Sequence, residues 1–256
     1  MQEQRIVPDG GGVIREGEQL DELQLGGLRI LQKKQGFRYG MDAVLLADFI
    51  RVQPRDHVAD FGTGTGILPL LLHGRGKGAR FDALELQEDM AEMAARSMAL
   101  NGLSEVIRVH HLPVEQAEQV LARCSLDAIV CNPPYGAPGT TLKNPSDTLR
   151  LARHQGADGL VMWFRVAQRL LKGKGRMAIV YPAIRMLEVM EQMQAAHLTP
   201  KRLRLVYPTR EKPANLVLLE AVKDAKPMLH PEPPLIVYEP DGTPTEELRR
   251  IYHLTD

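Results

Sequence analysis

The sequence predicts an α/β fold with a seven-stranded, mostly parallel sheet, one antiparallel strand and helices on both faces. Two observations support this fold class. From residue 57 to residue 222, short apolar runs typical of buried strands alternate with longer segments of helical periodicity, which is the pattern of a doubly wound sheet. The last two apolar runs are joined by a loop too short for a crossover helix, so one strand must run antiparallel to its neighbours.

Each expected element follows from its own residues. The helix over 88–100 is the clearest, because Met90, Ala94 and Met98 share one face and Asn101-Gly102 forms a stop. Gly173 and Gly175 predict a turn after the longest helix. The expected strands are His57–Phe61, Phe81–Leu86, Val106–Val109, Leu126–Cys131, Met177–Tyr181, Leu203–Tyr207 and Leu216–Val222. The expected helices are Gly66–Leu72, Glu88–Leu100, Val114–Ala122, Asp158–Leu171 and Leu187–Ala196.

The segments outside this alternation predict additions to one core rather than a second domain. Before the core, we expect a hairpin around Leu23–Leu31 and a helix over Ala43–Ile50 that Asp42 caps. After it, a proline-rich stretch predicts an extended tail that ends in a short helix over Glu246–Tyr252. The predicted division is an extension over 1–50, a core over 51–222 and a packed tail over 223–256.

Composition excludes several classes of protein. Hydrophobic content of 44% with 25% charged residues is typical of a soluble globular protein, and no apolar run approaches the ~18–20 residues that span a bilayer. We therefore expect no membrane partner. Cys124 and Cys131 have neither CxxC spacing nor histidines nearby, which argues against a disulfide framework or a metal site and favours reduced thiols in a cytoplasmic protein. The oligomeric state is left open, with a monomer favoured.

The formal net charge is zero, so a nucleic-acid partner would have to bind local basic patches. One basic segment, Lys33 to Arg38, has aromatic neighbours and is either an RNA contact or a solvated loop. A second group lies near the closing strand pair and forms either an RNA-facing stripe or a solvated edge. Its members are Lys201, Arg202, Arg204, Arg210 and Lys212.

A glycine-rich loop, Asp60-Phe61-Gly62-Thr63-Gly64-Thr65-Gly66, follows the first expected core strand. Glycines there allow close approach of a ligand to the backbone. Its GxGxG spacing differs from the GxGxxG of dinucleotide sites, because Ile67 stands where the last glycine would be. Glu85 ends the next strand and can accept both hydroxyls of a ribose. The glycine-rich loop and Glu85 together suit S-adenosylmethionine (SAM), and we expect Asp60 to lie near the ammonium group of SAM.

A proline elbow, Asn132-Pro133-Pro134-Tyr135, follows the fourth expected core strand. Prolines donate no N–H, so the chain cannot continue pairing, and the elbow lies at the carboxyl edge where ligands bind in such sheets. An exocyclic amine is a poor nucleophile because its lone pair is delocalised. If the Asn132 side-chain oxygen and the Pro133 carbonyl accept its N–H bonds, the lone pair can point at a methyl donor. Tyr135 offers a ring face to a flipped base.

The sequence also resembles the bacterial tRNA(Val) (adenine-N6)-methyltransferases. The resemblance runs from Gly40–Ala47 through the glycine loop and NPPY to Ala152-Arg153-His154 and Lys212–Leu218. It implies a Rossmann-like class I methyltransferase fold and methyl transfer from SAM to an adenine N6 in tRNA beside the anticodon. It also implies that Asp60, the three loop glycines (Gly62, Gly64 and Gly66) and Glu85 bind SAM and that Asn132 and Tyr135 hold the target amine. We expect Thr63 of the same loop to bind SAM as well, and Pro133 to hold the amine with Asn132.

One position departs from that family. Such enzymes usually carry an aspartate near the SAM adenine after the third strand, where this chain has His111, whose neutral imidazole could still accept the bond. Two alternatives stay open at this stage. Glutamine methyltransferases that act on peptide-chain release factors share NPPY, but they carry a helical N-terminal region, whereas the residues before the first core strand here are Gly-rich and basic with one expected helix. A non-catalytic RNA-binding scaffold of the same fold is the other, although the intact motifs oppose it.

Overall fold

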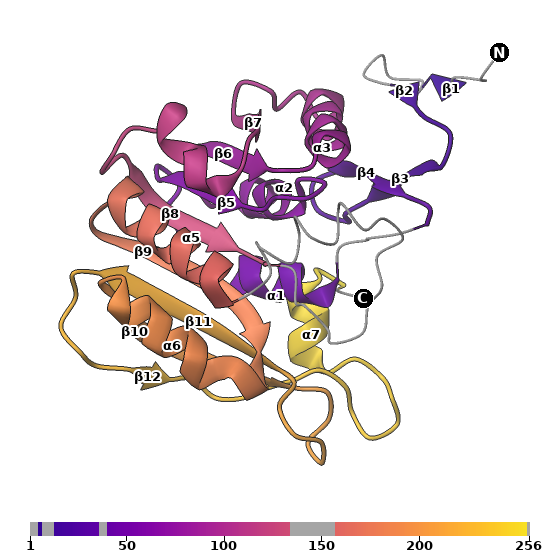
Figure 1. The fold of residues 1–256 in the computed structure, drawn as a ribbon. Coiled ribbons are helices and arrows are strands. Elements are labelled where there is room, and N and C mark those ends of the chain that lie inside the picture. Colours follow the sequence, from indigo (N-terminus) through magenta and orange to yellow (C-terminus); the bar gives the residue numbers. More distant parts are fainter. Residues whose placement is uncertain (1–4, 7–12, 36–39, 134–156, 255–256) are drawn as a thin grey trace.

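The computed structural model describes residues 5–6, 13–35, 40–133 and 157–254. Within these ranges, one large sheet has the strand order β12-β10-β11-β9-β8-β5-β6-β7, and β13 pairs with β10 (Figure 1). Its long strands are β5 (His57–Phe61), β6 (Arg80–Glu85), β7 (Ile107–His111), β8 (Leu126–Cys131), β9 (Leu171–Pro182), β10 (Leu198–Tyr207) and β11 (Leu216–Lys223). The tail adds two short strands, β12 (His230–Pro231) and β13 (Leu235–Ile236).

This sheet confirms the predicted architecture. Of the seven long strands, β11 alone is antiparallel, since it pairs with both β9 and β10 in that sense while β5 to β9 are mutually parallel. Two hydrophobic cores cover opposite faces. One contains side chains of α1 (Met41–Phe49), α2 (Ile67–Gly74) and α3 (Glu88–Leu100). The other contains side chains of η1 (Val114–Gln119), α5 (Ala157–Leu170) and α6 (Met186–Ala195).

Three local predictions need correction. Asp42 lies inside the first turn of α1, where it accepts a bond from the Ala43 N–H, and Gly40 is the N-cap. The segment after Val114 is a 3₁₀ helix that ends at Gln119. The expected Gly173–Gly175 turn is a bulge within β9, because Leu171 pairs with Leu126 while Arg176 pairs with Ala128. The strand therefore starts six residues before the expected Met177.

The segment before the core forms two hairpins, β1–β2 (Arg5–Ile6 with Val13–Ile14) and β3–β4 (Glu18–Glu22 with Arg29–Lys33). Ion pairs connect the second hairpin to α3: Arg96 bonds both oxygens of Glu18 at 2.9 and 2.6 Å, and Lys33 pairs with Asp89. Lys33 is thus occupied within the protein. Lys34 of the basic segment is exposed, and residues 36–39 lie outside the described residues.

Two basic residues of β10 hold the tail. They belong to the basic group near the closing strand pair, so the hypothesis that this group forms an RNA-facing stripe is wrong for these two. The buried Arg202 bonds Glu220 at 3.0 Å and Glu232 at 2.7 Å, and its guanidinium lies 4.3 Å from the centroid of the Phe49 ring. Arg204 donates two 2.8 Å bonds to Glu247 of α7 (Glu246–Ile251). These two arginines therefore face the tail, and Arg210 and Lys212 remain exposed.

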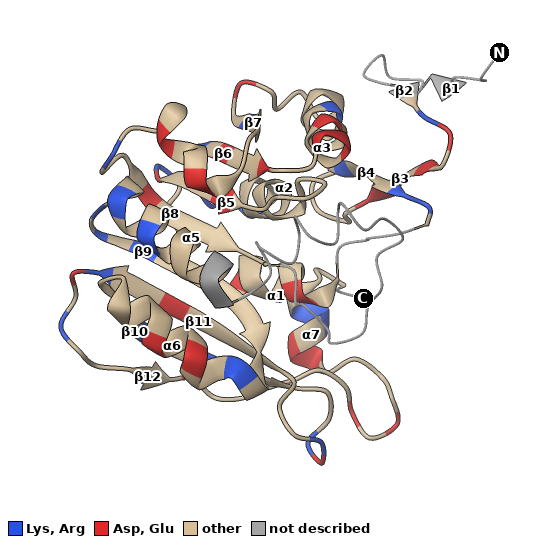
Figure 2. Ribbon diagram, in the orientation of Figure 1, with Lys and Arg blue, Asp and Glu red and all other residues tan. Residues whose placement is uncertain are grey.

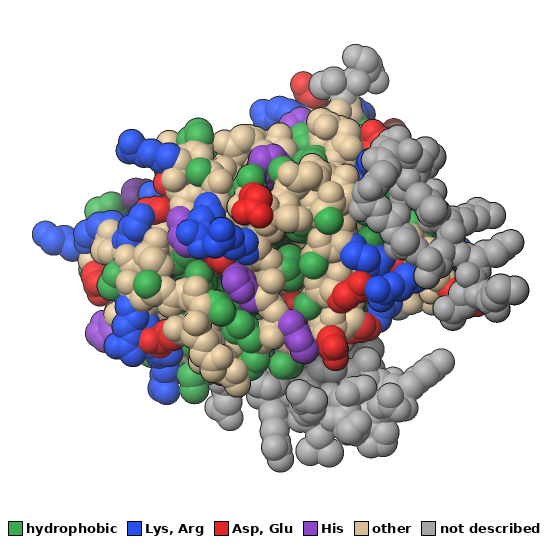
Figure 3. All heavy atoms as spheres, turned by 90° about the horizontal axis from the view of Figure 1, so that it is seen from above, with side chains coloured by type: hydrophobic (Ala, Val, Ile, Leu, Met, Phe, Trp, Pro, Cys, Tyr) green, Lys and Arg blue, Asp and Glu red, His purple; other side chains and the backbone are tan. Residues whose placement is uncertain are grey.

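Charge is dispersed over the surface. Figure 2 shows short basic and acidic stretches scattered among uncharged ones, and the face in Figure 3 mixes both signs with histidine side chains. No helix within the described ranges is long and apolar enough to cross a bilayer. The division into extension, core and tail stays a prediction.

Candidate methyl-transfer site

The glycine loop connects β5 to α2, and all three of its motif glycines have positive φ: 73° at Gly62, 58° at Gly64 and 88° at Gly66. L-residues with side chains rarely adopt that conformation. Two of these glycines also lack space for a side chain. A Cβ on Gly62 would lie 3.0 Å from the Trp163 ring, and one on Gly66 would collide with Met98 of α3. The motif thus sets both the turn and the packing of the helices behind it.

Glu85 at the end of β6 holds the loop in place. Its Oε2 accepts the Gly64 N–H at 2.8 Å and its Oε1 accepts the Gln87 N–H at 2.9 Å. The carbonyl of the preceding Leu84 accepts the N–H groups of Gly62 and Thr63 at 3.0 and 2.9 Å. Each carboxylate oxygen of Glu85 has a second lone pair, so the side chain can order the loop and still accept a ligand hydroxyl.

Asp60, the last-but-one residue of β5, is 2% exposed. Neither of its carboxylate oxygens has a hydrogen-bond partner among the described residues. Burial raises the pKa of Asp60 to about 7, and the nearby Glu85 charge contributes to the rise. A buried carboxylate without partners is costly, and a cation placed beside it removes that cost. The ammonium group of an amino-acid ligand meets this requirement, so these residues fit SAM.

The elbow residues described by the structure, Asn132 and Pro133, follow β8, which lies beside β5. Asp60 pairs with Val130 of β8 and with Ala83 of β6. The carboxyl ends of β8, β5 and β6 therefore bring Asn132, Asp60 and Glu85 to one edge of the sheet. Pro133 is buried and Asn132 is half-buried. Tyr135, with Pro134 and the long segment after it, lies outside the described residues.

His111 ends β7 directly beside Glu85 in the register of the sheet. Its Nε2 lies 3.1 Å from the Leu86 carbonyl oxygen, and the side chain is otherwise exposed. Because a carbonyl can only accept, a neutral ring that makes this bond has its proton on Nε2 and an acceptor at Nδ1. The contact of His111 with the SAM adenine stays a prediction.

Comparisons with known proteins identify the family of this chain. The family model described as "Methyltransferase small domain" matches residues 40–198. The chain belongs to this family. A relative from Tolumonas auensis named tRNA1(Val) (adenine(37)-N6)-methyltransferase is 32% identical over 82% of this chain and 86% of its own. One of the same name from Parabacteroides distasonis is 29% identical over 76% and 81%.

Solved structures agree on the fold. A predicted O-methyltransferase from Agrobacterium tumefaciens superposes with a TM-score of 0.66 at 21% identity, over 83% of this chain and 96% of that one. Together with the family, these findings confirm the predictions of a class I methyltransferase fold, an enzyme, and SAM as the cofactor.

Trp163 is a residue of this methyltransferase whose place at the site was not predicted. Its helical spacing with Val161, Phe164 and Ala167 indicates a core residue, and its ring does contact Phe61 edge-on with centroids 6.3 Å apart. The same ring also lies against Gly62, and its Nε1 is buried without a partner among the described residues. The hydroxyls of Thr63 and Thr65 share that state. Several buried polar atoms thus surround the loop. Only the packing of the Trp163 ring against Gly62 shows that its Nε1 is among them.

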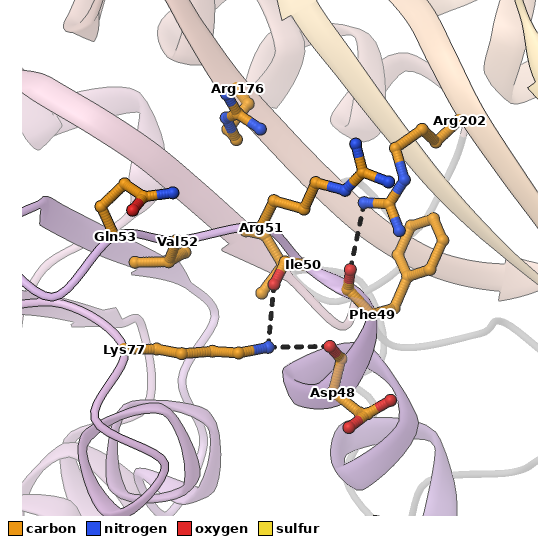
Figure 4. Close-up of a pocket in the computed structure, with 9 residues that line it drawn as sticks. All are labelled: Asp48, Phe49, Ile50, Arg51, Val52, Gln53, Lys77, Arg176 and Arg202. Atoms are coloured by element: carbon orange, nitrogen blue, oxygen red, sulfur yellow. Dashed lines mark hydrogen bonds between the residues drawn. The ribbon is translucent and has the colours of Figure 1, made fainter.

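A hollow of about 580 Å³ lies at the opposite, amino-terminal edge of the sheet, and it is lined by Arg51, Lys77, Arg176 and Arg202 among others (Figure 4). Lys77 donates to the carbonyls of Ala47, Asp48 and Ile50 at 2.8, 2.7 and 2.9 Å. A cation bound to the carbonyls that end a helix stabilises that end. These contacts connect α1 to the core, so the hollow is a structural junction and not the reaction site.

Proposed function

We propose that this methyltransferase transfers the methyl group of SAM to the exocyclic N6 amine of an adenine in tRNA, near the anticodon. The observation that carries the proposal is the meeting of Asp60, Glu85 and the Asn132-Pro133 elbow at adjacent strand ends. The relatives named as tRNA adenine-N6 methyltransferases support the choice of acceptor. RNA is therefore the proposed partner, and the cytoplasm the proposed location.

Seven residues are proposed to bind the cofactor. Asp60 would receive the ammonium group, and the backbone of Gly62, Thr63, Gly64 and Gly66 would pass beneath the amino-acid end. Glu85 would accept the ribose hydroxyls, and His111 Nδ1 would accept a bond from the adenine amine. SAM, when bound, would supply a sulfonium methyl group with a neutral thioether as the leaving group. The methylated amine would carry a positive charge and release one proton to solvent.

The elbow is proposed to hold and activate the acceptor. The Asn132 side-chain oxygen and the Pro133 carbonyl would each accept one N–H of the target amine, which draws the nitrogen toward a pyramidal geometry. Preorganised acceptors of this kind strengthen as charge develops on the amine, so they contribute more in the transition state than in the ground state. Tyr135 is proposed to stack on the flipped base.

The test is direct. The protein is incubated with methyl-labelled SAM and bulk unmodified tRNA, and the RNA is digested to nucleosides. We expect label in N6-methyladenosine. Label that appears instead on the glutamine of a release factor supplied in a parallel reaction would overturn the proposed acceptor. Calorimetric titration with SAM that detects no binding would instead favour the scaffold alternative.

A further inference from the structure

Two large apolar side chains stand in solvent just beyond the end of β9. Ile184 in η2 (Ala183–Arg185) is 94% exposed, and Leu187 in the first turn of α6 is 68% exposed. Single exposed apolar residues are common, but these two lie three residues apart, on neighbouring turns. The core-facing residues of α6 are Val189 and Met193, so packing of the helix does not require Ile184 or Leu187.

The position of this pair relates it to the elbow. Cys131 pairs with Ile179 of β9, so Asn132 stands beside Val180, and Ile184 lies four residues farther along. At about 3.3 Å per residue, that separation along the strand direction is roughly 13 Å at most. Leu216 pairs with Pro182, and the Ala183 N–H donates to the Asn215 carbonyl at 3.0 Å. The β10–β11 loop therefore lies at the same edge (Figure 1).

That loop presents two cations. Arg210 and Lys212 are both exposed, and neither forms an ion pair with another described residue. Other cations nearby are engaged: Arg185 bonds Glu188 at 2.7 Å and lies 5.1 Å from the Tyr181 ring centroid. We call the surface formed by Ile184, Leu187, Arg210 and Lys212 the carboxyl-edge surface.

We propose that the carboxyl-edge surface binds the RNA strand that flanks the target adenine. The inference rests on the proposed function and deepens it. Arg210 and Lys212 contact backbone phosphates, and Ile184 and Leu187 contact the apolar faces of unstacked bases. Continuity with the elbow favours a nucleic acid over a protein partner, and so do two cations that have no acidic partner among the described residues, since a phosphate backbone supplies negative charge.

The first experiment compares the double variant Arg210→Ala/Lys212→Ala with the wild type on unmodified tRNA. We expect the KM for tRNA to rise about tenfold or more, with kcat and the SAM dissociation constant unchanged. The slope of log KM against log salt should also fall by about 1.4, because each lost phosphate contact on a single strand removes about 0.7. Lys201→Ala is the matched control, since Lys201 is a cation near the other end of β10. It should change neither KM nor the salt slope.

The second experiment replaces Ile184 with Ser and uses Met228→Ser, 62% exposed in the tail, as its control. Ile184→Ser should raise the KM for tRNA several-fold with no change in thermal stability, and Met228→Ser should leave both unchanged. If the wild type methylates tRNA while both carboxyl-edge variants keep wild-type KM and salt dependence, the surface does not bind RNA and the proposal is wrong. If the wild type methylates no tRNA, the proposed function itself fails.

Discussion

Asp60→Asn provides the most informative perturbation, because the structure predicts opposite effects on stability and on cofactor binding. Burial raises the pKa of Asp60 from 3.8 to about 7. Between the unfolded pKa of 3.8 and the folded pKa of about 7, the Asp60 carboxyl keeps its proton in the folded state but has lost it in the unfolded state. The free energy of unfolding therefore falls as the pH rises through this range, and the loss is complete above about 7. A shift of about three units corresponds to a loss of about 4 kcal/mol, at about 1.36 kcal/mol per unit.

Asparagine has the same shape but no charge, so the variant escapes this loss. In urea denaturation, we expect the stability advantage of Asp60→Asn over the wild type to grow by about 2–3 kcal/mol between about pH 5 and about pH 8. The variant should also lose SAM binding. Excess SAM should therefore stabilise only the wild type, as linkage requires for a ligand that binds the folded state.

Asp82→Asn is the matched control on the neighbouring strand. Burial alone would raise the pKa of Asp82, but hydrogen bonds with His110 at 2.6 Å and His57 at 2.5 Å hold that pKa well below its usual range. The charged form therefore stabilises the fold above the unfolded pKa, and that stability is lost as the pH falls. Asp82→Asn should be less stable than the wild type near neutral pH. An Asp60→Asn advantage that is the same at both pH values would refute the reasoning about burial.

Two further predictions concern stability. Gly66→Ala should lower the free energy of unfolding by about 2–4 kcal/mol, because the new methyl group meets Met98 at a backbone φ of 88°. Gly102→Ala should lower it by only about 1 kcal/mol, because Gly102 has a positive φ but open space around it. Arg202→Ala should cost about 3–5 kcal/mol because it leaves the buried Glu220 without its closest cation, while Lys201→Ala should stay within about 0.5 kcal/mol. Chemical denaturation of the variants and the wild type checks both.

Either pair of variants can contradict its argument. Equal losses for Gly66→Ala and Gly102→Ala would show that backbone strain alone governs the glycine loop and that the contact with α3 is unimportant. A loss for Arg202→Ala no larger than that for Lys201→Ala would mean that water replaces the arginine at Glu220.

The sheet and the loop could be predicted from sequence because the signals are local. The GxGxG motif lies between an apolar strand and a helix, and the three positive φ values are what such a motif is expected to adopt. Likewise, Glu85 ends one strand and Asn132 directly follows another, so the parallel order of the strands alone brings both residues to one edge of the sheet.

The remaining features depend on contacts between distant residues. Trp163 meets Gly62 about a hundred positions away in the chain, and periodicity indicates only that such a tryptophan is buried. Arg202 and Arg204 looked like part of a basic stripe because their acidic partners, Glu220, Glu232 and Glu247, lie far along the chain. The bulge over 172–175 reflects tertiary pairing that overrides the local turn signal.

The central claim is that cofactor binding and amine activation are divided between the glycine loop with Glu85 and the Asn132 elbow. Paired measurements on Asn132→Ala test it most directly: the SAM dissociation constant by calorimetry, and the rate of single-turnover methyl transfer to tRNA. The division predicts a dissociation constant within about twofold of the wild type and a transfer rate lower by about a hundredfold or more. Equal loss of SAM affinity and transfer, or transfer at the wild-type rate, would contradict it.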